Sequence, residues 1–427
     1  MKASIFKTII EKYFPKTAKK YYEKINGSKD EPKYLHDQML TEEYSPDMTY
    51  TSISGNYTRV TADVVSFDSP VPLKSRATIK QATGDIPKLG IGFSLNEKQM
   101  NTLRILKNAK GRLVEFLKKI FKDTESCIFG IKEKIEQAHL IGFSSGVTII
   151  QDEQNVGHGI RINYNIPEAN QFGVVKNWND IDSKPIDDIK RVKKYAKTVG
   201  EYPNTMWIDS YGLDRLLKNK QVREFYAAGL NYTGTNFPAL DEEQVTSLFR
   251  RSLKLNLRVI ERSFIHEKDG KRIISEGWVE NMVVFTTGTN VGSLVYSTLA
   301  EEEFPTEGVV YTKPNPYILI SKSGSTNPVS ELTAGQALAI PVLQNVESLF
   351  YINSAELDES EQVEEDSLFK YDGTDYQRSI VVQSLNEVEE NLNVTEALTD
   401  AQIQDIINQL SDESQIAFEL KLEELTP

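Results

Sequence analysis

The spacing of apolar residues predicts two helical stretches in the first third of the chain. Near the N-terminus, apolar residues from Ile5 to Phe14 recur at helical spacing among lysines and precede Pro15, which is typical of an amphipathic helix docked on the fold. From residue 95 to about 141, apolar residues recur every three or four positions behind a capping signal at Ser94 and Glu97. At about 1.5 Å per residue, this helix or helix pair would form a long spine.

A different pattern, at residues 59–93, lies between these two stretches. Apolar and polar residues first alternate, and then Pro70 and Pro72 follow each other closely before a glycine-rich return. Two such prolines exclude a central strand. The segment therefore predicts a long two-stranded excursion with a turn at Gly84 and Asp85, and a helix-free excursion of this length usually has a function.

Beyond the spine, short strands and short helices follow one another irregularly. The predicted end of the spine at Gly142 is followed by a strand pair at 147–151 and 160–164. This irregular order predicts a mixed α/β region and not an alternating, doubly wound one. The further predicted helices are 185–196, 210–218, 221–228 and 241–253, and the further strands are 205–209, 257–261, 282–285, 291–299, 337–343 and 348–353, with a hairpin across 268–271.

Charge divides the 427-residue chain into two parts. Residues 354–427 contain twenty acidic and three basic residues, a local charge of −17, so residues 1–353 carry +4 of the total of −13. The acidic part regains helical periodicity at 399–410 and 414–425, which predicts two amphipathic helices. Its first section, 356–375, has the composition of a mobile segment.

The chemistry-bearing residues do not assemble into a recognisable catalytic or metal site. One cysteine, Cys127, and four scattered histidines exclude a disulfide framework and cysteine-rich zinc sites. The acidic clusters at 187–188, 241–243 and 301–303 are explained by helix N-termini or solvated loops. No apolar run is long enough to span a membrane, and the N-terminus lacks the apolar core of a signal peptide. We predict no enzyme activity, no cofactor and no metal.

A single motif favours an alternative. Residues 142–146 match the G-x-S-x-G pattern of hydrolases, in which Ser144 would be the nucleophile. That motif requires a strand before the serine and a helix after it. Here the predicted order is helix and then strand, so a helix C-terminus explains both glycines better.

The order of elements resembles the Hong Kong 97-like capsid fold of tailed phages, and in particular the lambda-type major head protein family. The segments that carry the resemblance are 131–143 with the hairpin after it, 184–189 with 206–222, 278–285 with 292–299, and 339–353. The resemblance implies an α+β fold with these parts: an N-terminal arm (1–58), an E-loop (59–93), a spine helix and P-domain sheet (94–177), a mixed α/β A-domain (178–336), closing P-domain strands (337–353) and an acidic C-terminal extension (354–427).

The same resemblance implies a function. The protein would be a major capsid protein that self-assembles into hexamers and pentamers of an icosahedral shell around double-stranded DNA. Scaffold, portal and head-decoration proteins would be its partners, DNA would be held without sequence specificity, and the protein would be made in the host cytoplasm and reside in the virion. Candidate intersubunit contacts are Lys74, Arg76, Lys80 and Lys88 in the E-loop. We predict no covalent crosslink. A cellular nanocompartment shell of the same fold is the alternative.

Overall fold

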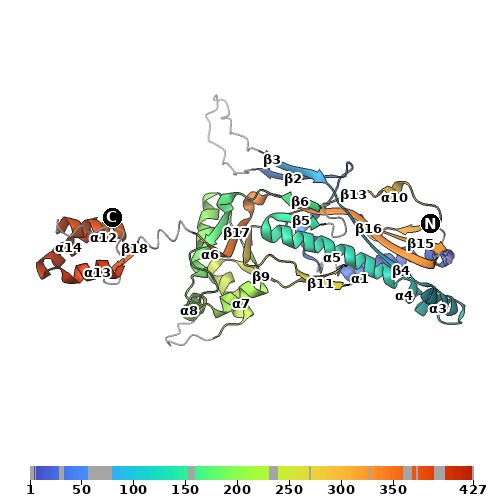
Figure 1. The fold of residues 1–427 in the computed structure, drawn as a ribbon, viewed down its shortest axis with the longest axis horizontal. Coiled ribbons are helices and arrows are strands. Elements are labelled where there is room, and N and C mark those ends of the chain that lie inside the picture. Colours follow the sequence, from blue (N-terminus) through green and yellow to red (C-terminus); the bar gives the residue numbers. More distant parts are fainter. Residues whose placement is uncertain are drawn as a thin grey trace, which may run out of the picture.

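The computed structural model places an elongated body beside a separate C-terminal unit (Figure 1). None of the helices in the described ranges combines the length and apolar character that crossing a membrane requires. The structure describes residues 4, 6–27, 33–55, 79–151, 159–229, 239–268, 271–326, 328–358, 368–371, 374–388 and 400–425.

The N-terminal arm docks on the body. Helix α1 (Lys7–Asn26) buries Ile10, Phe14 and Ala18 along one face, and the Phe14 ring stacks on Phe121 at 5.6 Å. The helix continues through the exposed Pro15, past the end expected there, because the apolar stripe extends on both sides of the proline. A short helix, α2 (Leu35–Met39), follows.

The predicted long spine is three helices: α3 (Glu97–Asn108), α4 (Leu113–Ile120) and α5 (Lys122–Ser145). The first break contains Gly111, whose φ of 79° is left-handed and favours glycine. The capping box consists of Asn96 and Gln99, and not the predicted Ser94 and Glu97. Helix α5 runs past Gly142 to Ser145, so the spine proper is about 36 Å long.

Helix α5 packs on a six-stranded sheet. Its main order is β1 (Leu40–Tyr44), β13 (Gly292–Ser297), β16 (Val329–Leu343), β15 (Leu319–Thr326) and β14 (Val310–Thr312), and β4 (Lys88–Leu95) pairs with the first half of β16. Strand β1 is parallel to β13, and the other pairs are antiparallel. The apolar faces of α1, α5 and this sheet form one core.

A five-stranded sheet forms the second core. Its order is β7 (Gln171–Val174), β17 (Phe350–Leu357), β12 (Met282–Thr286), β8 (Thr205–Asp209) and β9 (Asn256–Ile260). All of β8 is buried, as predicted, including the polar residues Thr205 and Asp209 at its ends. Four helices and a π-helical turn at Phe249–Leu253 contribute to this core: α6 (Pro185–Thr198), α7 (Ser210–Lys218), α8 (Lys220–Gly229) and α9 (Glu242–Leu248).

The strands of the two sheets do not follow the residue ranges expected for the A-domain and the P-domain. Within the range 178–336 expected for the A-domain, β13, β14 and β15 pair in the six-stranded sheet. Within the range 337–353 expected to close the P-domain, β17 begins and pairs in the five-stranded sheet. Apolar alternation identifies a strand, but it does not identify the neighbour with which the strand pairs.

Three two-stranded elements complete the body. The pair β2 (Thr49–Gly55) and β3 (Ile79–Asp85) stands off the body in Figure 1. Strand β3 lies within the predicted excursion of 59–93, but β2 precedes it, in the range 1–58 expected for the N-terminal arm. Residues 56–78 between them lie outside the described residues. The turn expected at Gly84 and Asp85 follows them, at Ile86 and Pro87. The other pairs are β5 (Val147–Gln151) with β6 (Gly159–Asn163), and β10 (Ser263–Lys268) with β11 (Lys271–Glu276).

The C-terminal extension contains a folded unit, which we call the C-terminal module (residues 368–425). Its helices α13 (Asp400–Gln409) and α14 (Asp412–Leu425) confirm the two predicted helices. The sequence patterns did not predict α12 (Arg378–Val388) or the pair β18 (Leu368–Tyr371) and β19 (Thr374–Gln377). These elements enclose a third, separate hydrophobic core. The segment 356–375, expected to be mobile, includes β18 and the first residues of β19, and residues 359–367 lie outside the described residues.

Candidate functional site

Two of the four predicted contact residues, Lys80 and Lys88, are among the described residues. Lys74 and Arg76 are outside the described residues, and Lys80 is in β3. Lys88 opens β4, and its half-exposed side chain donates a hydrogen bond from Nζ to Oε1 of Glu301 at 3.0 Å. Because Glu301 lies in the short helix α10 (Ala300–Glu303), this pair connects the end of the excursion to its own subunit.

The base of the β2–β3 pair is anchored in the body. The Ser52 hydroxyl donates to the carbonyl of Leu343, the last residue of β16, at 2.7 Å. The buried Tyr50 ring lies over Gly84, where an added Cβ would come within 2.7 Å of the tyrosine Oη. An added side chain at residue 84 would therefore displace the Tyr50 ring that packs at the base, while the strands extend away from the sheet.

Buried charges join the N-terminal arm to the spine, at a contact that we call the arm–spine seam (His36, Asp37, Lys132, Glu136 and His139). The backbone N–H groups of Leu35 and His36 donate to the two carboxylate oxygens of Glu136 at 2.9 and 3.0 Å, and the His36 Nδ1 lies 2.5 Å from Glu136 Oε2. Lys132 Nζ donates to both oxygens of Asp37 at 2.9 and 2.7 Å. The side chains of His36, Lys132 and Glu136 are almost completely buried.

Burial opposes the charged form of each titratable group whose pKa is shifted in the seam. For Glu136, burial opposes ionisation, but the hydrogen bond and charge of His36 outweigh it and hold the pKa at about 2. Burial lowers the pKa of Lys132, although Asp37 favours its charged form. Burial also lowers the pKa of His139 to about 4, and neither ring nitrogen has a hydrogen-bond partner among the described residues. The seam is thus a paired, water-excluded contact beside a neutral histidine.

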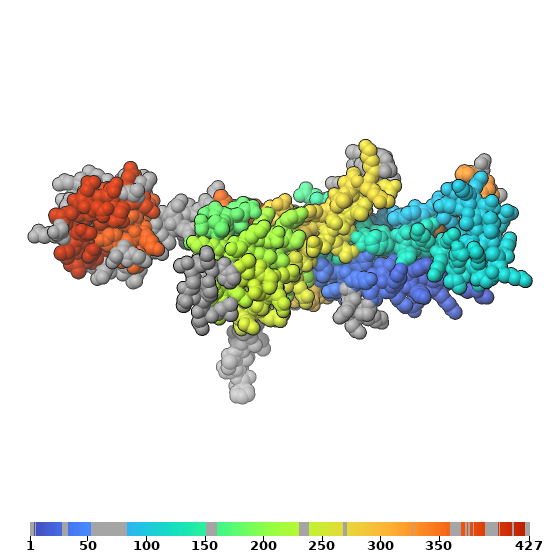
Figure 2. Space-filling view, turned by 90° about the horizontal axis from the view of Figure 1, so that it is seen from below, coloured from blue at the N-terminus to red at the C-terminus, as the bar shows by residue number. Residues whose placement is uncertain are grey.

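Two isoleucines are exposed on the β10–β11 hairpin. Ile265 and Ile274 pair directly across the strands and are 67% and 70% exposed, and Figure 2 shows the hairpin (yellow) projecting from the surface. On the opposite face, Phe264 is buried and His266 Nε2 lies 2.9 Å from both Gln137 Nε2 and Ser275 Oγ. His266 is therefore partly buried where the hairpin contacts α5.

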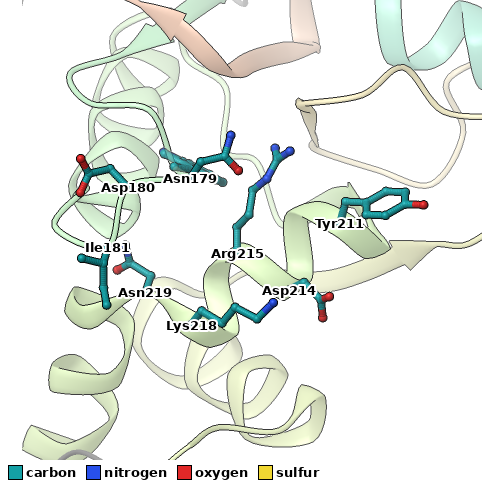
Figure 3. Close-up of a pocket in the computed structure, with 9 residues that line it drawn as sticks. Asn179, Asp180, Ile181, Tyr211, Asp214, Arg215, Lys218 and Asn219 are labelled. Atoms are coloured by element: carbon teal, nitrogen blue, oxygen red, sulfur yellow. The ribbon is translucent and has the colours of Figure 1, made fainter.

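A hollow of about 500 Å³ opens on the five-stranded domain (Figure 3). Arg215 extends from α7 into it, and Ile181 and Tyr211 are exposed at its edge. The Arg215 guanidinium also contacts the Asn281 amide and Glu280. This surface combines apolar groups with charges of both signs, as a protein contact does. The lining residues are Trp178, Asn179, Asp180, Ile181, Tyr211, Asp214, Arg215, Lys218 and Asn219.

The geometry does not support a nucleophile at Ser144. This serine lies in the last turn of α5, is fully buried, and donates its hydroxyl to the Leu140 carbonyl at 2.8 Å, as a helical serine does. Burial raises the pKa of the Cys127 thiol to about 12, so it is not an activated nucleophile. Within the described ranges, no group of three or more His, Cys, Asp or Glu side chains could hold a metal ion.

The sequence patterns missed the most important polar contacts of the body. Lys132 and Glu136 are four residues apart on α5, so they share one face of the helix, and α5 buries residues on all its faces. Charged residues inside such a helix need partners, and this was the available signal. The partners themselves lie about 100 positions earlier in the chain.

A docked arm, a projecting two-stranded loop, a spine helix and two sheets define a structural subunit with extended contact elements. The phage major capsid protein E family matches residues 22–354, well over half of the chain, and the chain belongs to this family. It is therefore a phage major capsid protein, as the sequence predicted, and the nanocompartment and hydrolase alternatives are not favoured. The match ends where the acidic extension begins.

Solved structures resemble this chain only at low sequence identity. A prophage capsid protein of E. coli CFT073 is 15% identical, with 79% of this chain and 98% of that chain covered and a TM-score of 0.49. A phage-related protein from Bordetella bronchiseptica RB50 is 10% identical (80% and 98% covered, TM-score 0.43). The capsid asymmetric unit of cyanophage A-1(L) is 10% identical (74% and 90% covered, TM-score 0.39). A comparison with curated proteins found no match.

Proposed function

We propose that this protein assembles into hexamers and pentamers that close into an icosahedral shell around double-stranded DNA, and that it resides in the virion. The observation that carries the proposal is the family match over residues 22–354, which includes the spine, both sheets and the projecting strands. The role is structural and not catalytic. In a symmetric shell, each contact that one subunit makes with its neighbour is repeated by every other subunit.

The projecting β2–β3 strands are the proposed principal contact. Lys80 is in β3, and Lys88 is the first residue of β4, which follows β3. Lys74 and Arg76 belong to the connecting segment 56–78. We propose that these cations contact acidic groups of a neighbouring subunit. Lys88 already pairs with Glu301 of its own chain, so a neighbour's carboxylate would join or replace that pair.

The β10–β11 hairpin is the proposed second contact. An isolated two-stranded hairpin is marginally stable in water, and this one places two isoleucines in solvent at its outer face. A neighbouring subunit that covers Ile265 and Ile274 would remove this apolar area from water and stabilise the hairpin. A shell subunit has such a neighbour at every position.

The charge of the body fits a container for DNA. Residues 1–353 carry a net charge of +4, which is too small for strong non-specific binding through many phosphate contacts. We propose that the shell encloses DNA without sequence recognition. Its assembly would require a scaffold, a portal and head-decoration proteins as partners.

Electron microscopy of the purified full-length protein tests the assembly. We expect uniform shells or rings of capsomers, and a protein that stays monomeric under all conditions, including with its scaffold, would contradict the proposal.

The double variant Ile265→Asp with Ile274→Asp tests the hairpin, with Ile265→Val and Ile274→Val as its control. We expect the aspartates to abolish assembly and the valines to preserve it. Normal assembly of the aspartate variant would exclude the hairpin as a contact.

A further inference from the structure

The C-terminal module is an addition to the capsid subunit. The family match ends at residue 354, and the module begins at 368 with a core that shares no residue with the two cores of the body. The module therefore lies outside the part of the chain that the family model covers. Its own core consists of Phe369, Val381, Val382, Leu385, Ile403, Ile407, Phe418 and Leu422.

Helix α14 of the module is apolar on two faces. Phe418 and Leu422 face the core and are buried, whereas Ile416 and Leu420 are 60% and 64% exposed. Residues four apart lie one above the other on a helix, so Ile416 and Leu420 form one ridge in solvent. The helix of a small isolated domain needs a single apolar face. The second face is thus available for a contact outside the module.

The charge of the module identifies the kind of partner. Residues 368–427 contain thirteen acidic and three basic residues. Two of the three bases are paired inside the module, Arg378 with Asp400 and Lys421 with Glu387 at 3.3 Å. The exposed Glu419 lies beside the ridge. Two modules that met through their ridges would bring like charges together, which opposes self-association. A basic partner would gain from the same charges.

We propose that the C-terminal module is a docking domain for a basic amphipathic helix of a partner protein. Apolar residues spaced four apart on that helix would pack on Ile416 and Leu420, and its lysines or arginines would face the surrounding carboxylates. The proposal concerns an added function of the subunit. It does not depend on how the shell assembles.

Two synthetic peptides of about 20 residues, long enough to form a helix, probe the ridge. One has leucines at positions i, i+4 and i+7 of each repeat and lysines elsewhere, and the other has glutamate in place of every lysine. Binding to the full-length protein is measured by fluorescence anisotropy. We expect the lysine peptide to bind, with an affinity that falls as salt rises, and the glutamate peptide not to bind.

The double variant Ile416→Ser with Leu420→Ser separates the ridge from charge alone. We expect it to bind the lysine peptide at least about ten-fold more weakly, while Ile181→Ser, at an exposed isoleucine of the body, binds normally. Both substitutions are at exposed positions, and circular dichroism should show an unchanged helix content. Equal binding by the wild type and the double variant would overturn the proposal. A second outcome would also overturn it: the lysine peptide does not bind, the wild type self-associates, and the double variant does not self-associate.

Discussion

The body and the C-terminal module are held together in opposite ways. In the body, the arm–spine seam connects residues about 100 positions apart, and β1 pairs with β13 some 250 positions away. The seam also buries charged side chains. In the module, the core lies within residues 368–425, and the buried residues among those that the structure describes are apolar except Ser384. Loss of one polar partner in the seam should therefore destabilise the body, whereas the module depends on a few apolar side chains.

This difference indicates how the two parts tolerate change. The body cannot be divided at the seam, because each partner would leave a buried charge without its counter-ion. The module can be removed or exchanged as a unit, since its core contains no residue of the body.

Loss of one module core residue should have the largest effect. Phe418→Ala costs about 3–5 kcal/mol, which is comparable to the total stability of about 3–9 kcal/mol expected for a domain of this size. We expect calorimetry of the full-length protein to lose the transition of the module and keep that of the body. Ile416→Ala on the exposed face is the control and should retain both transitions. A single transition in the wild type would show that the two parts are not independent.

Removal of one seam carboxylate should destabilise the body by a similar amount. Glu136→Ala leaves His36 and two arm N–H groups without their acceptor, and breaking a buried pair in this way costs about 3–5 kcal/mol. Denaturant unfolding should show the loss, and limited proteolysis should cut near residue 35. Glu125→Ala, which breaks only the exposed pair with Lys24, should have a much smaller effect. An unchanged midpoint for Glu136→Ala would contradict the assigned role of the seam.

The seam should also make the body sensitive to acid. The pKa of His139 is about 4 in the folded protein and 6.5 ordinarily, so the unfolded chain binds a proton between pH 6.5 and 4 that the folded chain does not. Stability attributable to His139 should therefore fall by about 3 kcal/mol across this range. Stability from Glu136 is present above its ordinary pKa of 4.5 and is lost as the pH falls towards its folded pKa of about 2.

The variant His139→Leu isolates the first of these two effects. The His139 ring nitrogens have no hydrogen-bond partner among the described residues, so leucine leaves no polar group unpaired. Denaturant midpoints measured from pH 7 to 4 should fall less steeply for the variant than for the wild type. Parallel curves would show that His139 does not cause the sensitivity.

The smallest effect on stability is expected at Lys88. Lys88→Ala breaks an exposed ion pair with Glu301, and such pairs contribute less than about 1 kcal/mol. The thermal transition of the body should hardly change. Assembly is the sharper measurement, because a defect in shell yield with normal stability would identify Lys88 as an intersubunit contact. Normal yield would remove it from that set.

The sequence predicted most elements and few of their partners. The arm helix, the β10–β11 hairpin, and helices α13 and α14 follow from apolar spacing that is visible in the chain. The pairing of β13 with β16, and that of Lys132 with Asp37, depends on which distant segments meet. The local spacing of apolar residues does not indicate which distant segments of the chain will pair. The spine was predicted as one helix or a helix pair, whereas it is three helices, and the left-handed backbone of Gly111 lies in the break between α3 and α4.

The parallel pairing of β1 with β13 has a consequence during synthesis. Leu40 pairs with Gly292, so the six-stranded sheet cannot close until some 250 further residues have left the ribosome. At about 5–20 residues per second this takes roughly 10 to 50 seconds. Throughout this interval the nascent subunit lacks its finished sheet, and assembly on the ribosome is delayed until nearly the whole body has been translated.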